Sequence, residues 1–166
     1  MKINENKSMK NKLFIICPFC QLENHLRNKY GNDIFFMTTT AGILNLEADE
    51  ISTIKNFIQR ENITDIYLIS DIGCNFIEEA IKNEKEFGLL AEQQLRSLIQ
   101  NMLPKINSTF SRQEVKKIVA ETNVQQQAKY LASENILNYE ITSFEIKIHT
   151  LITNKHEIIV DKFKLN

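Results

Sequence analysis

The sequence predicts an α/β fold, in which a mainly parallel β-sheet is flanked by helices and ends in a C-terminal hairpin. Three short apolar runs are typical of strands buried on both faces, and helical patterns lie between them. The order strand, helix, strand requires a crossover connection and therefore predicts parallel pairing. Alternating apolar and polar residues over 144–152 predict a further strand with one solvated face.

The predicted strands are bounded by turn signals or by polar loops. In chain order they are Leu13–Cys17, Asp33–Thr38, Asp65–Ser70, 144–152 and 157–163. Gly31 and Asn32 mark the turn before the second strand, and residues 153–156 form the turn of the closing hairpin. The helical patterns cover 21–30, 46–61, 75–83, 89–102 and 111–132. Ser111 and Glu114 have the spacing of a capping box, which predicts that the last of these helices begins there.

Length and charge limit the class of protein. The 166 residues fit one domain, and we assign residues 13–166 to it and residues 1–12 to a flexible, polar N-terminal arm. A net charge of −1 and the lack of a long apolar stretch give no reason to expect nucleic acid or a membrane as partner. Three cysteines without a secretory signal favour a reducing compartment, and we expect the cytoplasm.

The cysteines follow two of the predicted strands. Cys17 and Cys20 come after the first, and Asp71 and Cys74 come after the third. Ligands of open α/β sheets bind beyond the carboxyl ends of the strands, so neighbouring strands would bring these side chains together. Three thiolates and a carboxylate could then hold a tetrahedral Zn²⁺ ion. Two alternatives remain open: the thiols are small buried apolar groups, and Asp71 is the N-cap of the helix that follows.

Four stretches along the chain carry a more specific signal. They are Phe14-Ile15-Ile16-Cys17, Phe36-Met37-Thr38-Thr39-Thr40-Ala41-Gly42, Tyr67-Leu68-Ile69-Ser70-Asp71-Ile72-Gly73-Cys74 and Asn123-Val124-Gln125-Gln126-Gln127-Ala128. With the closing strand pair, their order and spacing resemble the β-class carbonic anhydrases over nearly the whole chain. This resemblance implies the β-carbonic-anhydrase fold, a zinc ion as cofactor and a homodimer.

The chain departs from the family pattern at several of these motif positions. The resemblance places Cys17 and Cys74 at the two zinc-cysteine positions and Asp71 at the zinc-histidine position. Phe19 and Gln21 stand where the family has an aspartate and an arginine that together orient the oxygen attacking CO₂, and Cys20 lies between them. We therefore name no catalytic residue and expect no efficient CO₂ hydration. We expect Phe19 to fill the space of the missing polar groups.

Two other functions compete with this interpretation. Cys17-Pro18-Phe19-Cys20 between a strand and a helix is also the setting of a thiol–disulfide redox pair. That interpretation leaves Cys74 unexplained, and the thioredoxin-like folds need a second, cis proline before a strand. The third hypothesis is a dimeric interaction protein without catalysis. The histidines at 25, 149 and 156 lie outside the motif positions and are expected at the surface, and no small-molecule substrate is indicated.

Overall fold

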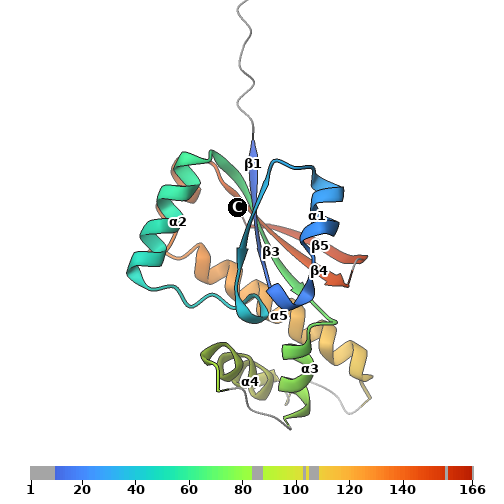
Figure 1. Cartoon of the computed structure of the whole chain (residues 1–166). Coiled ribbons are helices and arrows are strands. Elements are labelled where there is room, and N and C mark those ends of the chain that lie inside the picture. The colour runs from blue at the N-terminus through green and yellow to red at the C-terminus, as the bar shows by residue number, and fades with distance from the viewer. Residues whose placement is uncertain (1–9, 84–87, 103, 105–108, 156, 166) are drawn as a thin grey trace, which may run out of the picture.

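A five-stranded sheet forms the centre of the computed structural model, which describes residues 10–83, 88–102, 104, 109–155 and 157–165 (Figure 1). The strand order is β2-β1-β3-β4-β5. The first four strands are parallel and β5 runs antiparallel to β4. Their bounds are β1 Asn11–Ile16, β2 Ile34–Thr38, β3 Ile63–Asp71, β4 Lys147–Asn154 and β5 Glu157–Leu165. The predicted fold class and the C-terminal hairpin are thus confirmed.

The helices agree closely with the sequence patterns. They are α1 Glu23–Tyr30, α2 Ala48–Arg60, α3 Asn75–Lys82, α4 Leu90–Met102, α5 Arg112–Leu131 and α6 Asn138–Ser143, with 3₁₀ helices η1 Pro18–Cys20 and η2 Thr40–Gly42. The capping box before α5 is confirmed, because Ser111 and Glu114 each accept a hydrogen bond from the other's backbone N–H. Among the described residues, no helix combines the length and apolar character needed to cross a bilayer.

The predicted strand over 144–152 is wrong at its start. Helix α6 precedes it, Phe144 caps that helix, and Glu145 has a left-handed backbone (φ 53°) that breaks the extended path. Strand β4 begins only at Lys147. A helix as short as α6 shows too few turns for a periodic pattern. At the other end of the chain, β1 begins at Asn11, inside the predicted arm, and residues 1–9 lie outside the described part.

The sheet separates two apolar layers. The larger layer packs α2, α3, α4 and α5 against alternate strand residues such as Leu13, Ile15, Leu68 and Ile148. Figure 1 shows α3 and α4 beyond the end of the sheet, next to α5. The smaller layer lies under α1 and contains Phe14. Burial on both faces explains why β1 and most of β3 read as continuous apolar runs.

An aromatic ladder crosses the smaller layer. The ring of Phe14 stacks on Tyr67 at 4.6 Å between centroids, and Tyr67 stacks on His149 at 4.3 Å. These three residues are direct register partners on β1, β3 and β4. His149 is therefore half-buried, and its Nε2 lies 2.7 Å from Asp65 Oδ1, which corrects the expectation of a surface histidine.

The Asp65–His149 pair makes stability depend on pH. Partial burial raises the pKa of Asp65, but hydrogen bonds with His149 and Thr64 outweigh it, so this pKa lies below its ordinary value. A carboxyl group with a depressed pKa stabilises the fold at pH values above its unfolded-state pKa of about 4. This stabilisation is lost as the pH falls through the folded-state pKa. Asp65→Asn should lower the urea midpoint at pH 7, and its deficit should shrink in acid. Replacement of the exposed Asp33 by Asn is the control; equal deficits for Asp65→Asn at both pH values would contradict the prediction.

Candidate metal centre

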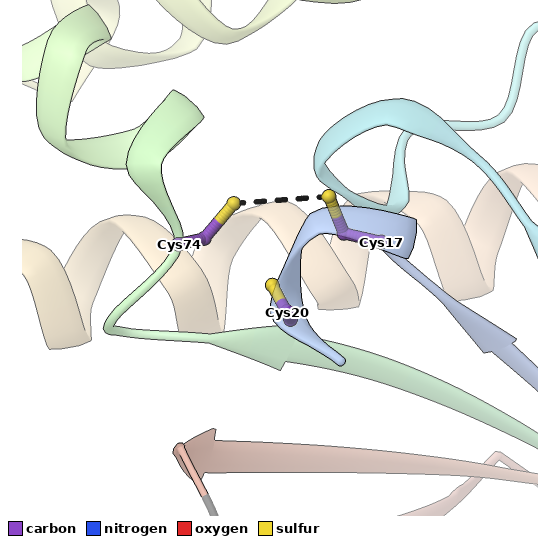
Figure 2. Close-up of side chains that lie close together, drawn as sticks. All are labelled: Cys17, Cys20 and Cys74. Atoms are coloured by element: carbon purple, nitrogen blue, oxygen red, sulfur yellow. Dashed lines mark hydrogen bonds between the residues drawn. The ribbon is translucent and has the colours of Figure 1, made fainter. Parts of the chain in front are cut away.

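Three cysteines meet at the carboxyl ends of β1 and β3 (Figure 2). Cys17 follows the last residue of β1, Cys20 ends η1, and Cys74 is the N-cap residue of α3. Since β1 and β3 are parallel neighbours, both strands deliver their following loops to the same edge of the sheet. Residues 57 positions apart in sequence thereby come into contact.

The sulfur atoms form a compact, mostly buried group. All three lie within 4.8 Å of one another, and the Sγ atoms of Cys17 and Cys74 are 3.9 Å apart. Cys17 and Cys74 are buried, Cys20 is half-buried, and none of the three forms a disulfide. The site therefore presents three sulfur donors, with limited access from solvent through Cys20.

The local sequence turns the chain so that Cys20 returns to Cys17. Pro18 occupies the first turn of η1, where its fixed φ is favourable and its missing N–H is not needed. The backbone N–H of Cys20 donates to the carbonyl oxygen of Cys17 at 3.1 Å. Gln21 then takes a left-handed conformation (φ 52°) that ends the turn. The Cys-x-x-Cys spacing thus places both sulfurs on the inner side of one 3₁₀ turn, where they face Cys74 (Figure 2).

The surroundings favour negative charge on Cys17. Hydrogen bonds from the thiols of Cys20 and Cys74, followed by backbone N–H groups of Phe19 and Ala41, lower the pKa of Cys17. The Ala41 nitrogen lies 3.3 Å from the sulfur. Their interaction with Cys17 raises the pKa of Cys20 and of Cys74. Negative charge in the cluster is therefore favoured on Cys17 over Cys20 and Cys74.

Asp71 lies at the end of β3 but outside the sulfur group. Its Oδ1 accepts a hydrogen bond from the Gly73 N–H at 2.7 Å, and its Oδ2 accepts one from the Thr153 hydroxyl at 2.6 Å. A β-carbon at position 73 would lie 2.8 Å from Asp71 Oδ1, so glycine permits this approach. The helix N-cap is Cys74, so the capping role considered for Asp71 is corrected: it holds the turn before the helix.

Phe19 points away from the site. Its side chain is 64% exposed, and its ring meets the edge of Phe76 on α3 with centroids 5.2 Å apart. The expectation that Phe19 fills the interior is therefore wrong. The inner positions of η1 are taken by the cysteine sulfurs, and a 3₁₀ turn directs neighbouring side chains to different sides.

The donor set fits a zinc ion. Zn–S bonds of about 2.3 Å in a tetrahedron require sulfurs separated by about 3.8 Å, close to the distance between Cys17 and Cys74. Small movements of Cys20 would complete three such edges, because its sulfur lies within 4.8 Å of both others. In the described part of the chain, no histidine or carboxylate joins this group.

Known proteins resemble this chain in structure but do not match it in sequence. No protein-family model matches the chain. No curated protein matches it either. Among solved structures, a tetrameric β-carbonic anhydrase of Sordaria macrospora superposes with a TM-score of 0.74 at 16% identity, covering 95% of this chain and 81% of that one. The β-carbonic anhydrase CafA of Aspergillus fumigatus gives 0.74 at 18% identity, covering 95% and 76%.

A third solved structure, the Coccomyxa β-carbonic anhydrase in complex with acetazolamide, gives a TM-score of 0.70 at 14% identity, covering 94% of this chain and 72% of that one. The chain thus has the fold of the β-carbonic anhydrases. At these identities the likeness establishes the architecture alone.

Residue types alone did not indicate several groups around the site. The sequence patterns indicate all three cysteines and Asp71, but neither Thr153 nor the N–H of Ala41. Thr153 belongs to β4, 82 residues from Asp71, and only the pairing of β3 with β4 brings them together. A backbone N–H has no sequence signature, so the contact with Cys17 could not be predicted.

Replacing Thr153 tests its hold on the turn before Cys74. Thr153→Val keeps the side-chain shape but leaves the buried Asp71 carboxylate without one donor, which should lower the free energy of unfolding by about 1–3 kcal/mol. Urea denaturation measures this loss. Thr153→Ser keeps the hydroxyl and serves as the matched control, so equal losses in both variants would assign the effect to packing instead.

Proposed function

We propose that this chain is a zinc-binding protein on the β-carbonic-anhydrase fold, with Cys17, Cys20 and Cys74 as ligands and without efficient CO₂ hydration. One observation carries the proposal: three free sulfurs from two strand ends lie within 4.8 Å of one another. Thiolates are preferred ligands of zinc. Three thiolates and one Zn²⁺ ion together carry a net charge of −1. The N–H of Ala41 and the start of α3 offset this negative charge.

The ligand set differs from the one that the resemblance to the carbonic anhydrases implies. Asp71 stands at the zinc-histidine position, and its carboxylate is engaged by Gly73 and Thr153. Cys20 supplies a donor from the other loop instead. In this proposal Asp71 acts through the turn that presents Cys74, and the third ligand position has moved from the end of β3 to η1.

Weak catalysis follows from the chemistry of the same residues. A bound zinc ion supplies Lewis acidity, and charge donated by three thiolates reduces it relative to histidine ligands. Phe19 and Gln21 stand at the aspartate and arginine positions; Phe19 offers no hydrogen-bonding group and Gln21 no charge, so the two cannot replace that ion pair. The exposed Phe19 ring adds an apolar surface beside the cysteine turn.

Metal content is the first test. Protein purified without added metal or chelator should contain one zinc per chain, and its thiols should react only after chelation. Cys20→Ser should lose most of the zinc affinity, because a serine hydroxyl is a poor ligand in place of a thiolate. Asp71→Asn preserves the shape of the turn and should retain zinc. Cadmium substitution should give thiolate charge-transfer absorption that weakens in Cys20→Ser.

The same preparations separate the competing functions. The zinc-loaded protein should hydrate CO₂ far more slowly than an intact β-carbonic anhydrase assayed beside it, and comparable rates would contradict the loss of catalysis. A metal-free protein with three titratable thiols would overturn the zinc site. A reversible Cys17–Cys20 disulfide in the purified protein would favour the redox function instead.

We also propose that the chain forms a homodimer. The support is the resemblance to β-carbonic anhydrases, one of which is described as tetrameric, together with exposed apolar side chains such as Phe19 and Tyr139. Size-exclusion chromatography with light scattering should give twice the chain mass of 19.3 kDa at micromolar concentration. A single species at the chain mass would contradict the dimer.

A further inference from the structure

A cavity of about 590 Å³ lies beside the larger apolar layer, and none of its described lining residues is a cysteine. Its walls come from the segment after η2, from α4 and from α5. The floor is apolar and includes the buried side chains of Ile43, Leu44 and Leu98. This volume lies within the range of roughly 300–1,000 Å³ that is typical of small-molecule sites.

The lining is unusual in its chemistry. Of the thirteen lining residues that the structure describes, seven are asparagine or glutamine, and none is Asp, Glu, Lys, Arg or His. Charged residues make up 25% of the chain, so a lining of this size without one is a distinctive environment. Side-chain amides both donate and accept hydrogen bonds, and they offer no countercharge to an ionic ligand.

Two of these amides form a fixed framework. Gln127 Oε1 accepts a hydrogen bond from the Leu44 N–H at 2.8 Å, and its Nε2 donates to Asn123 Oδ1 at 3.3 Å. Nearby, the hydroxyl of Tyr130 accepts from the Leu46 N–H at 3.3 Å. These bonds tie α5 to the segment after η2, so the inner wall of the cavity is held in place before any ligand arrives.

The outer wall carries amides of a different kind. Gln93, Gln94 and Asn101 on α4 and Gln126 on α5 are exposed, and the described part of the chain provides no hydrogen-bond partner for their side chains. Free donors and acceptors therefore line the same cavity as the buried apolar side chains. This is the arrangement that orients a ligand with both polar groups and C–H surfaces.

We propose that this cavity binds an uncharged saccharide of one or two rings. Ring hydroxyls and N-acetyl groups would exchange hydrogen bonds with the free amides, and ring C–H groups would cover Leu98 and the aromatic face of Tyr130. A carboxylate or ammonium group on the same ring would lose hydration without meeting an opposite charge.

The framework also connects the cavity to the thiols. Asn123 is almost fully buried, and its Nδ2 donates to the Ala41 carbonyl oxygen at 3.0 Å. The Ala41 N–H in turn contacts Cys17 Sγ. A ligand that binds to Gln127 and Asn123 would stabilise this framework further and make opening of the segment around Ala41 rarer. Cys17 is buried, so a thiol reagent reaches it only when this segment opens, and occupancy of the cavity should therefore slow its labelling.

Calorimetric or NMR titration of the full chain with N-acetylglucosamine, glucosamine and glucuronic acid tests the ligand class. Saturable binding is expected for the neutral sugar, with weaker binding of its charged analogues. Gln126→Ala should weaken binding about five- to tenfold, the effect of one or two lost hydrogen bonds. Gln125→Ala is the matched control, since Gln125 is exposed on the same helix but does not line the cavity.

Labelling of Cys17, followed by peptide mass spectrometry on metal-free protein, tests the connection independently of the zinc site. A saturating neutral sugar should slow labelling about fivefold or more, the usual lower range of coupling between sites. No saturable binding of the neutral sugar at millimolar concentration, or equal binding in Gln126→Ala and wild type, would overturn the binding site. Binding with an unchanged labelling rate would overturn the connection to Cys17.

Discussion

The parallel pairing of β1 with β3 is the constraint on which the site depends. It aligns two strand ends at one edge of the sheet, and the chain leaves each end through a turn that carries cysteine. The sulfurs of Cys17 and Cys74 are buried because helices cover both faces of these strands. Without this pairing Cys17 and Cys74 would separate, because no interaction between residues close in sequence holds them together.

Hydrogen bonds from outside the two strands then fix the site. Thr153 on β4 binds Asp71, Asp71 binds the N–H of Gly73, and the resulting turn places Cys74 at the start of α3. On the other side, the N–H of Ala41 reaches Cys17 from η2. The cysteines are thus held by contacts from β4 and η2 as well as by their own strands, and this would keep the spacing that metal ligands need.

The same architecture places three sulfurs where a zinc ion could bind. In the proposed site, a third thiolate ligand would bind the zinc ion more tightly and would reduce its Lewis acidity. The outward orientation of Phe19 leaves this part of the η1 turn without a polar group facing the thiols. The amide-lined cavity lies on the other side of Ala41, so both sites share one backbone segment.

The sequence by itself determined the fold class and nearly all the strands and helices, and it indicated the three cysteines as candidate metal ligands. Buried strands and amphipathic helices leave local patterns, and Ser111 with Glu114 marked a helix start through contacts within four residues. It failed at α6, which is too short for a period, and at Phe19 and His149, whose exposure depends on what packs beside them. Only the tertiary structure decided that the sulfur of Cys20 lies beside that of Cys74, and that Asp71 accepts a hydrogen bond from Thr153 instead of facing the sulfurs. That choice rests on contacts between strands more than 50 residues apart, and no local pattern encodes them.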